Sequence, residues 1–590
     1  MTPSNSMWLA FGLSCIMAVG CNSTNSTSSK GDTGQALSKQ PVRQLTPPKK
    51  SLSDIDESEK RATSLTKFIR GSLLDSLAER KYKTVFNTLD SEFVGRWPNL
   101  DSFKKVETGT ITISHLGEAG AWQNRREFSR AMNIFFASSA IMERRTFKVY
   151  EIIIDEDAPL NAYVKAHLQL AGKDQEGRRY QLEADVVLTA RGKDGVWVIT
   201  AWDFERAIWS NIRTPFFKNV STVTGVQYAD SRQMRKLTNE LVDLRRLFSS
   251  GGVTIFDENG DGALDILTTR KGRGTRIFIN DGKSGFQKKK IYRSHNDEDA
   301  TNFYLAVDID RDGDTDLVST HVNYSDNQEA SLTVYLKTDG KFVPNKKLLS
   351  FNNEKQHREI DFPAIVTCDL NDDQRLDFLV LGYLNSESGG TQFNLINGQD
   401  GQKNLLFISE SDGTYRERAG QWGMGESQYS YVAECYDFDS DGDSDVLVGN
   451  DYGQNNFYQN ENGQRFTKLP GHPFAKSRGF TMGISMADPN NTGQFSVSLS
   501  NMYSHAGNRI VPQVSQLGAE MKASVLALAG GNNLFERRGE SWVDTAQSRG
   551  VNYAEWAWGN IFFDVDNDGD KDQFVVNGFT THSDPTAPDF

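Results

Sequence analysis

Residues 437–448 read DFDSDGDSDVLV, and this stretch decides the fold class. Oxygen-bearing side chains stand at positions 1, 3, 5 and 9 of the window, a glycine stands at position 6, and a β-branched apolar run follows. Four further windows share this pattern and begin at Asp257, Asp308, Asp369 and Asp564. A worn copy, from Asp488 to Ser496, has lost three of its carboxylates. Successive windows begin 51 to 76 residues apart, and such a period predicts an array of structural repeats.

The spacing of the oxygen atoms indicates calcium. Oxygens at positions 1, 3, 5 and 9 of a tight loop converge on one point, and glycine at position 6 permits the sharp turn. Ca²⁺ takes roughly six to eight hard oxygen ligands, whereas Mg²⁺ demands a smaller and more rigid shell. The five full windows hold 23 of the 78 acidic residues, and a divalent cation relieves their mutual repulsion. We therefore predict about five structural Ca²⁺ ions. The predicted ligands are Asp257, Asn259, Asp261, Asp265, Asp308, Asp310, Asp312, Asp316, Asp369, Asn371, Asp373, Asp377, Asp437, Asp439, Asp441, Asp445, Asp564, Asp566, Asp568 and Asp572.

The EF-hand is the rival interpretation, because its loop begins with the same spacing. It requires Glu at position 12 and a helix on either side of the loop. Position 12 of the full windows is occupied by Thr268, Ser319, Val380, Val448 and Val575. A strand-like run follows each window, so the EF-hand is excluded, and Asp-rich turns without metal remain the alternative. Gln374 stands where the loop glycine is expected, which predicts a strained or weaker third site.

A second half completes each repeat. After the loop and its strand come two further strand-like segments joined by a glycine turn, as in Asn456–Asn460, Gly463 and Phe466. Four antiparallel strands per repeat are the pattern of a propeller blade. We therefore predict a mainly β protein: a calcium-loop β-propeller over residues 216–590, with roughly six to seven blades and an incomplete last blade, preceded by a small α+β cone-like domain. Either strands near 216–255 help to close the ring, or the chain is a truncated product.

The repeats resemble the FG-GAP/VCBS repeats of integrin-α-like propellers and, more narrowly, the cartilage-acidic-protein (ASPIC/UnbV) family. The narrower likeness lies in Val448–Gly453, Ser500–Ser504, Ala506–Arg509 and Trp556–Gly559. It covers about residues 216–590 and implies a propeller, usually seven-bladed, with Ca²⁺ in its blade loops. It also implies an exported binding or adhesion scaffold and no general catalytic activity.

The N-terminus predicts export. Residues 7–20 form an apolar run that is shorter than the roughly 20 residues of a membrane-spanning helix and suits a secretory signal. The tetrapeptide AVGC resembles a bacterial lipobox, which implies lipidation of Cys21. We predict a lipoprotein-type signal peptide over 1–21 and a disordered tether over 22–59, with the protein lipid-anchored on the bacterial cell envelope (outer membrane or surface) or secreted. An uncleaved anchor, or a start at Met7, is the alternative.

Residues 60–212 predict an α+β domain. Apolar residues recur at helical spacing over 64–95 and 126–142, and strand-like segments follow, ending in a hairpin with an Asp-Gly turn at 194–195. This order resembles the nuclear-transport-factor-2-like (SnoaL-like) cone fold, in which a curved sheet wraps a helix. Some members of that superfamily are enzymes that use an Asp or a His in a cavity. We interpret Asp203 as a strand-end polar residue and His167 as an exposed strand histidine; a cavity role is the alternative for each.

Two cysteines, Cys368 and Cys435, each lie just before an Asp-rich loop, in different repeats. Equivalent strands of separate repeats are usually too far apart for a disulfide. Two buried free thiols are therefore predicted, and a pair is the alternative.

Composition and motifs limit the classes of function that this sequence can have. The formal net charge of −13 argues against a nucleic-acid-binding surface, which needs a basic footprint. No nucleophile elbow, zinc-protease or P-loop motif occurs, so no catalytic residue is predicted. We predict a scaffold for a protein or carbohydrate ligand, with membrane contact only through the lipid anchor. The first alternative is a propeller enzyme acting on an extracellular polysaccharide or small molecule, for which a polar group of Asn501, His505, Asn508 and Arg509 is the weak candidate. The second is binding in an N-terminal pocket lined by Phe147 and Trp197.

Overall fold

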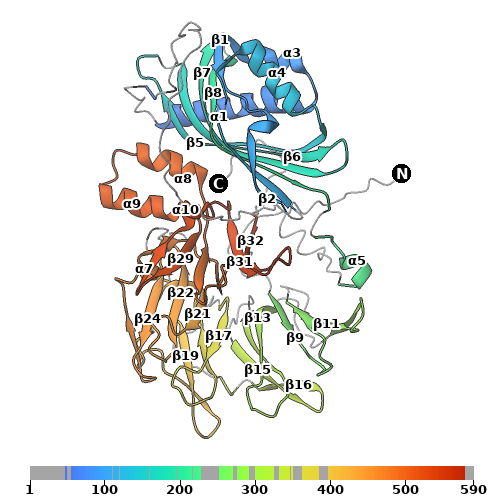
Figure 1. Ribbon diagram of the computed structural model, residues 1–590. Helices are drawn as coiled ribbons and strands as arrows, with labels where there is room; N and C mark the ends of the chain where they lie inside the picture. The colour runs from blue at the N-terminus through green and yellow to red at the C-terminus, as the bar shows by residue number, and fades with distance from the viewer. Residues whose placement is uncertain are drawn as a thin grey trace, which may run out of the picture.

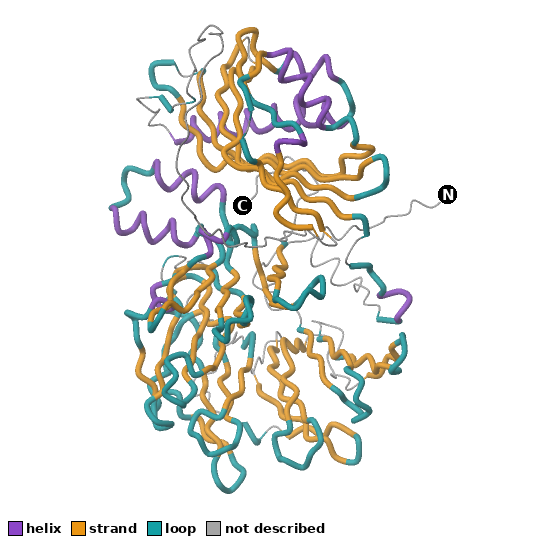
Figure 2. Tube along the Cα trace, in the orientation of Figure 1, coloured by secondary structure: helices purple, strands orange, loops and turns teal. Residues whose placement is uncertain are grey.

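The computed structural model in Figures 1 and 2 shows an N-terminal α+β domain above an array of small sheets. The described residues are 45, 47–48, 55–108, 111–118, 120–158, 160–193, 196–214, 217–226, 252–269, 275–290, 299–323, 331–345, 347–349, 362–383, 396 and 398–578. The predicted signal peptide, Cys21, most of the tether and the Asp-Gly turn lie outside them. None of the described helices is both long and apolar enough to cross a membrane.

One curved sheet forms the N-terminal domain. Its main path runs in the order β2-β3-β8-β7-β6-β5, and β1 pairs with both β8 and β4. Three register shifts between β5 and β6 mark bulges, and bulges bend and twist a sheet. The strands are β1 Leu89–Gly95, β2 Phe103–Thr108, β3 Ile111–Leu116, β4 Gln123–Asn124, β5 Ser139–Ile154, β6 Asn161–Asp174, β7 Arg179–Lys193 and β8 Val196–Ile212.

Helices pack against the concave side of this sheet (Figure 1). They are α1 Ile55–Phe68, a π-helical turn Ile69–Asp75, α2 Ser76–Ala78, α3 Tyr82–Asn87, a 3₁₀ turn Leu100–Ser102 and α4 Arg125–Phe135. A capping box starts α4, because Asn124 accepts from the Glu127 N–H while the Glu127 carboxylate accepts from the Asn124 N–H. The helix predicted over 126–142 ends at Phe135, since residues from Ser139 onward pair with β6 instead. Tertiary pairing overrides the helical spacing there.

Side chains fill the interior of the cone. The ring of Trp97 lies at its centre, with centroid separations of 5.2 to 6.4 Å from Phe128, Phe135, Phe136, Trp202 and Phe204. Phe147 and Trp197 are 1% and 8% exposed and belong to the same core. Packed side chains therefore occupy the place of the apolar pocket that these two residues were expected to line.

Among the described residues, the repeat array has six successive sheets, five of four antiparallel strands and a last one of two, and a further two-stranded sheet pairs Gly453–Gln454 with Arg478–Gly479. The first two contain β9 Val253–Phe256, β10 Asp265–Thr268, β11 Arg276–Asn280, β12 Phe286–Lys290, β13 Asp299–Val307, β14 Asp316–Asn323, β15 Ser331–Thr338 and β16 Lys341–Asn345. The third and fourth contain β17 Ile365–Cys368, β18 Asp377–Val380, β19 Leu405–Ser409, β20 Tyr415–Glu417, β21 Tyr429–Tyr436, β22 Asp445–Asp451, β24 Asn456–Asn460 and β25 Phe466–Lys468. The fifth and sixth contain β27 Gly483–Ala487, β28 Ser496–Ser500, β29 Asn533–Arg538, β30 Ser541–Asp544, β31 Ala557–Phe563 and β32 Asp572–Asn577.

Shorter elements connect these sheets. They are α5 Ser221–Thr224, β23 Gly453–Gln454, α7 Pro473–Lys476, β26 Arg478–Gly479, α8 His505–Ile510, a 3₁₀ turn Val511–Gln513, α9 Ala519–Leu528 and α10 Ala546–Arg549. The predicted order of strand, acidic loop, strand, strand, turn and strand is present in all five complete sheets. The sixth sheet has two strands among the described residues, as expected for an incomplete last repeat.

Successive sheets pack face to face, with their first strands adjacent. Apolar clusters span each neighbouring pair; one cluster joins Val318 and Val334 of the second sheet to Phe378 and Phe407 of the third. A disulfide links Cys368 at the end of β17 to Cys435 in β21, with a Cα–Cα distance of 6.5 Å. The prediction of free thiols is therefore wrong. First strands of neighbouring sheets converge, which brings Cys368, one residue before its loop, and Cys435, two residues before its loop, within disulfide reach.

Residues 217–226 run between the last sheet and the first. The ring of Phe217 lies 6.2 Å from Phe563 and 6.0 Å from Phe574, on the two strands of the sixth sheet. At its other end, Gly225 approaches β12 so closely that a Cβ would sit 2.9 Å from the Phe286 carbonyl oxygen. This segment therefore bridges the ends of the array, in the region where strands were expected to help close a ring. Residues 227–251 lie outside the description.

The two domains meet through α8, which follows β28. Arg509 donates to Glu59 of α1 through both Nε and Nη2, at 2.8 and 2.6 Å, and also to the Val149 carbonyl of β5. His167 is 6% exposed, and its ring centroid lies 4.7 Å from that of Tyr553 of the repeat array, with the two rings tilted by 53°. The prediction that His167 is exposed is wrong, because the face of β6 that carries it is covered by the second domain.

Candidate metal centres

The acidic windows form six loops with one backbone shape. We number them by sheet: 257–265, 308–316, 369–377, 437–445, 488–496 and 564–572. In every loop the position-6 N–H donates to the position-1 carboxylate, at 2.5 to 3.1 Å. Positions 4 and 6 both have positive φ in every loop. Sequence reasoning identified the turn at position 6 but missed position 4, which Arg311, Ser440 and Asn567 occupy in three of the loops.

The position-9 aspartate is the buried end of the first four loops, whereas Asp572 of the sixth loop is half-buried. Asp445 is fully buried, and its Oδ2 accepts the Phe438 N–H at 3.2 Å while its Oδ1 accepts the Asn460 N–H at 2.9 Å. The aspartates of the first three loops have the same two bonds, one from position 2 and one from the third strand. Carboxylate oxygens have further lone pairs, so these bonds leave room for a cation.

Aspartate oxygens converge in three of the loops. In each, three carboxylates place oxygen atoms within 4.8 Å of one another: Asp308, Asp310 and Asp316; Asp437, Asp439 and Asp441; Asp564, Asp566 and Asp572. Burial and the neighbouring carboxylates raise the pKa of Asp310 and of Asp566. An all-oxygen set of like charges in so small a space fits a hard divalent cation.

Asparagine replaces one carboxylate in the first and third loops. Asn259 Nδ2 donates to Asp261 Oδ2 at 2.8 Å, and Asn371 Nδ2 donates to Asp373 Oδ2 at 3.2 Å. Each amide retains an oxygen that accepts the N–H of the position-5 residue. These loops therefore keep the oxygen positions with one negative charge fewer.

Burial raises the pKa of two position-9 carboxylates, to about 6 at Asp377 and to about 7 at Asp445. Because a metal ligand must be deprotonated, protons compete with a cation for these carboxylates. A bound cation would also provide the opposite charge that favours the ionised form.

The fifth loop shows what the turn requires. Its positions 3, 5 and 9 are Asn490, Thr492 and Ser496, yet Asp488 still accepts the N–H groups of Thr492 and Gly493. The turn therefore forms from backbone hydrogen bonds to the position-1 carboxylate. Because it has lost three of its carboxylates, we predict that this loop binds no metal.

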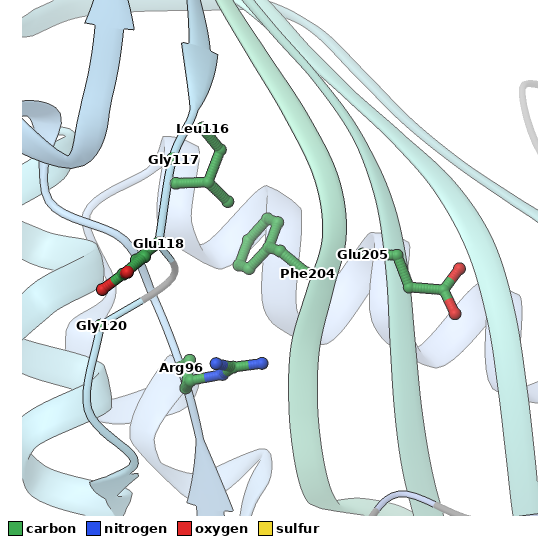
Figure 3. A pocket seen from close by; sticks show the side chains of 7 residues that line it. All are labelled: Arg96, Leu116, Gly117, Glu118, Gly120, Phe204 and Glu205. Carbon is green, nitrogen blue, oxygen red and sulfur yellow. The ribbon is translucent and has the colours of Figure 1, made fainter. Parts of the chain in front are cut away.

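The candidate residues of the N-terminal domain have structural partners. Asp203 lies within β8, not after the last strand as predicted, and accepts from Arg96 Nε at 2.7 Å. Arg96 borders an open pocket of about 390 Å³ (Figure 3). The pocket is lined by Arg96, Leu116, Gly117, Glu118, Gly120, Phe204 and Glu205. Its charged lining residues are Arg96, Glu118 and Glu205.

The polar group proposed at Asn501, His505, Asn508 and Arg509 is not a surface site. Arg509 holds the two domains together, as described above. Asn508 Nδ2 donates to the carbonyls of Ser504 and Ala529, at 2.9 and 2.8 Å. His505 faces Tyr553, with Nε2 3.3 Å from its hydroxyl oxygen, and burial lowers the pKa of His505 well below its ordinary value. Asn501 accepts a hydrogen bond from Thr481 inside the fifth sheet.

Comparison with known proteins identifies the repeats. The family described as FG-GAP-like repeat matches residues 257–319 and 437–497. FG-GAP-like repeats are therefore present, and the matches contain the first, second, fourth and fifth loops. Among curated proteins, none matches the sequence. The narrower likeness to the ASPIC/UnbV and integrin-α-like propellers stays a prediction.

The N-terminal domain has similar solved structures. A putative scytalone dehydratase from Novosphingobium aromaticivorans has 10% identity and a TM-score of 0.20, covering 28% of this chain and 94% of its own. A hexachlorocyclohexane dehydrochlorinase (LinA) has 8% identity and a TM-score of 0.21, covering 28% and 97%. An NTF-2 like protein of unknown function from Silicibacter pomeroyi has 12% identity and a TM-score of 0.16, covering 25% and 97%. At these values the likeness supports no statement about activity.

Replacing Gln374 with glycine is expected to stabilise the protein. Gln374 has φ of 64°, and a side chain in that region costs roughly 1–2 kcal/mol. Part of this gain is offset by the greater freedom of glycine in the unfolded chain, so Gln374→Gly should raise the free energy of unfolding by about 1 kcal/mol. Denaturant titration measures it. The neighbouring Arg375→Gly is the control and should give no gain; equal gains from both would contradict strain at Gln374.

Asp445 is expected to make the metal-free protein less stable as pH rises. Its pKa is about 7 in the folded state and about 4 in an unfolded chain. Between these values the folded state holds more protons, so stability falls with rising pH across this window. Urea titrations at pH 5 and pH 7, after removal of divalent cations, should show a larger loss for the wild type than for Asp445→Asn. An identical pH dependence in both proteins would refute the assignment.

Proposed function

We propose that this protein is an exported, calcium-stabilised β-propeller that serves as a binding or adhesion scaffold on the bacterial cell envelope. One observation carries the proposal: five full acidic loops share one backbone turn, closed by the same hydrogen bond from position 6 to position 1, and in three of them carboxylate oxygens converge. A single acidic turn is common without metal, whereas the same turn repeated along the chain, with converging oxygen atoms, supports a metal-binding role. Its ligand is a protein or a carbohydrate.

The propeller is supported by how the sheets adjoin. Each complete sheet has four antiparallel strands, and the first strands of successive sheets are neighbours. Residues 217–226 touch both the sixth sheet and the first. This arrangement suits a radial array of blades of the integrin-α-like, ASPIC/UnbV type. A propeller of six to seven blades is the architecture we propose.

Calcium would be structural in this scaffold. The position-1, -3, -5 and -9 side chains of the five full loops would hold it, and calcium would supply charge neutralisation and rigidity to each loop. Because it would bind the folded state alone, it would stabilise that state by mass action. The third loop counts among the five calcium sites, because the Gln374 N–H still donates to the Asp369 carboxylate at 2.6 Å.

Export is supported by the disulfide. Cys368 and Cys435 are bonded, and structural disulfides persist in oxidising compartments such as the bacterial periplasm or the cell surface. The apolar segment before Cys21 and the Ser/Thr-rich tether point the same way. The tether would hold the globular part away from a lipid anchor at Cys21.

The free end of the array is the proposed binding face. In an antiparallel sheet the first and third strands end at the same edge, so the acidic loops and the turns after the third strands lie together. The N-terminal domain packs at the opposite end, near α8 (Figure 1). The filled cone and this contact give the N-terminal domain a supporting role.

Removing calcium is expected to lower the stability of the repeat array. Each site held at 100-fold over its dissociation constant contributes about 2.7 kcal/mol. Chelation should therefore lower the thermal midpoint, and added Ca²⁺ but not Mg²⁺ should restore it. Native mass spectrometry should count about five ions. An unchanged midpoint on chelation would overturn the calcium assignment.

Lipidation is expected to depend on Cys21. In a bacterial host that processes lipoproteins, the wild type should partition into the detergent phase, and Cys21→Ser should not. Cys15→Ser, within the same apolar run, is the matched control and should still partition with detergent. Mass spectrometry of the N-terminal peptide identifies the modification. A wild-type chain that begins with unmodified Met1 would count against export by this route.

A further inference from the structure

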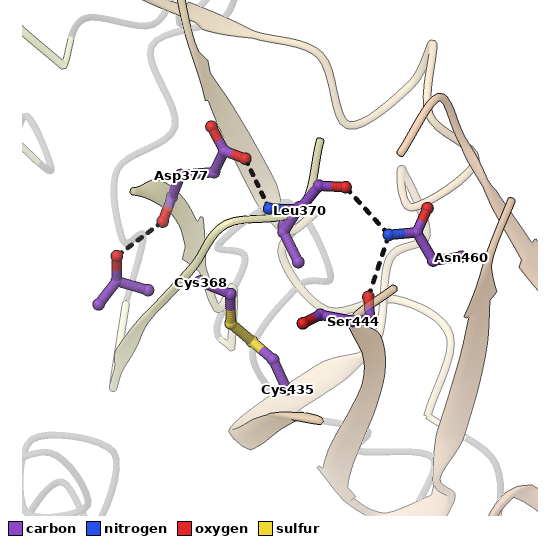
Figure 4. The surroundings of a disulfide bond; sticks show 7 residues. Cys368, Leu370, Asp377, Cys435, Ser444 and Asn460 are labelled. Carbon is purple, nitrogen blue, oxygen red and sulfur yellow. Dashed lines mark hydrogen bonds between the residues drawn. A yellow bond between two sulfur atoms is a disulfide. The ribbon is translucent and has the colours of Figure 1, made fainter. Parts of the chain in front are cut away.

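A chain of hydrogen bonds joins the third and fourth acidic loops. Leu370, at position 2 of the third loop, donates its N–H to Asp377 Oδ2 at 2.9 Å. The carbonyl of the same residue accepts from Asn460 Nδ2 at 2.9 Å. Asn460 in turn donates its own N–H to Asp445 Oδ1 of the fourth loop at 2.9 Å. Two residues therefore connect the buried aspartates of neighbouring loops. Figure 4 shows the part of this chain from Asp377 through Leu370 to Asn460.

Asn460 is held firmly in this bridging position. It is 2% exposed, and its Nδ2 also donates to the Ser444 carbonyl of the fourth loop at 3.1 Å. Its Oδ1 accepts the Gly463 N–H at 3.1 Å. Gly463 packs against the third loop so closely that a Cβ there would sit 2.9 Å from the Asn371 carbonyl oxygen. A change in the shape of either loop therefore reaches the other through Asn460.

The disulfide reinforces the same pair of loops. Cys368 immediately precedes Asp369, the first residue of the third loop, and Cys435 lies two residues before Asp437, the first residue of the fourth. Figure 4 shows the sulfur–sulfur bond beside Leu370, Ser444 and Asn460. The strands that enter the two loops are thus joined covalently.

The first and second loops repeat the arrangement with a different residue. Lys337 donates its N–H to Asp316 of the second loop at 2.7 Å, and its Nζ donates to the Glu258 carbonyl of the first loop. Glu258 donates its N–H to Asp265 at 2.8 Å. Between the second and third loops the equivalent residue is Ser409, whose hydroxyl stays with Asp373 of its own loop at 3.2 Å. The equivalent residue of the fifth sheet, Arg537, reaches a different atom, since its Nη1 donates to Ser440 Oγ of the fourth loop at 3.0 Å, and Arg311 of the second loop donates to the Gln374 carbonyl of the third. Among the described residues, a third-strand side chain bonds the position-2 carbonyl of the preceding loop in two pairs of loops, the first with the second and the third with the fourth.

We propose that the third and fourth loops bind calcium cooperatively, with Asn460 as the positioning residue that couples them. The inference rests on the calcium sites proposed above. Ordering one loop fixes Leu370 and Asn460, and the second loop then has less conformational freedom left to lose when it binds. By linkage the coupling is reciprocal, so either site raises the calcium affinity of the other by the same factor.

Hydrogen exchange during a calcium titration of the full chain tests this, because it reports each loop separately. Peptides covering 369–377 and 437–445 should gain protection together. Asp437→Asn, which weakens the fourth loop, should raise the calcium concentration needed to protect the third by about fivefold or more. In an Asn460→Ala background the same substitution should leave the third loop unchanged.

The matched control is Asn280→Ala. Asn280 has the equivalent strand position, donates its N–H to Asp265 at 2.7 Å and uses its side chain within its own loop, on the Leu264 carbonyl at 3.1 Å. This variant should retain the effect of Asp437→Asn on the third loop. If Asn460→Ala does not fold, Asn460→Ser replaces it, because a hydroxyl is too short to join both loops.

The outcomes that would overturn the proposal fall into two distinguishable kinds. The coupling is refuted, with calcium binding intact, if Asp437→Asn still raises the calcium concentration that protects the third loop in Asn460→Ala. It is also refuted if Asp437→Asn leaves that concentration unchanged in the wild-type background. If neither peptide gains protection when calcium is added, the calcium assignment itself fails, and the coupling with it.

Discussion

One buried aspartate organises each of the first four repeats. At position 9 of the first four loops it accepts a backbone N–H from the start of its own loop and another from the third strand of its sheet. Hydrogen bonds to charged groups contribute roughly 1.5–3 kcal/mol each, and a buried donor left without a partner is costly. These two bonds therefore hold the loop, the second strand and the third strand in a single geometry. Everything else at that edge of the array, including the converging oxygens, depends on it.

The same group creates the electrostatic problem that the loops must solve. A carboxylate removed from water prefers to be neutral, and the pKa of about 7 at Asp445 expresses that preference. Nearby aspartates at positions 1, 3 and 5 add repulsion. Hydrogen bonds therefore fix the backbone of the acidic loops, but the repulsion between their carboxylates is unfavourable. A bound divalent cation would relieve this repulsion. The worn fifth loop avoids the repulsion differently: it has lost three carboxylates but keeps the turn, which Asp488 still closes.

Much of this could be read from the sequence because the loop is local. Positions 1 to 9 are contiguous, so their spacing reports both the turn and the donor set. The third-strand partner of each position-9 aspartate was not visible, because it lies 15 residues away for Asn280 and Asn460 but 32 away for Ser409. Insertions of varying length conceal that register. The helix predicted to run to residue 142 failed for a related reason, since pairing with β6 decides the conformation there.

The sequence by itself determined the repeat unit, its acidic loops, its mainly β character and the α+β order of the first domain, because each rests on spacing within a short window. Only the tertiary structure decided which distant residues meet. Cys368 and Cys435 form a disulfide because the first strands of adjacent sheets converge. His167 is buried because another domain covers its strand, and the cone is filled because α4 and β8 place their rings around Trp97. These outcomes depend on contacts between segments far apart in the chain, and no local pattern encodes them.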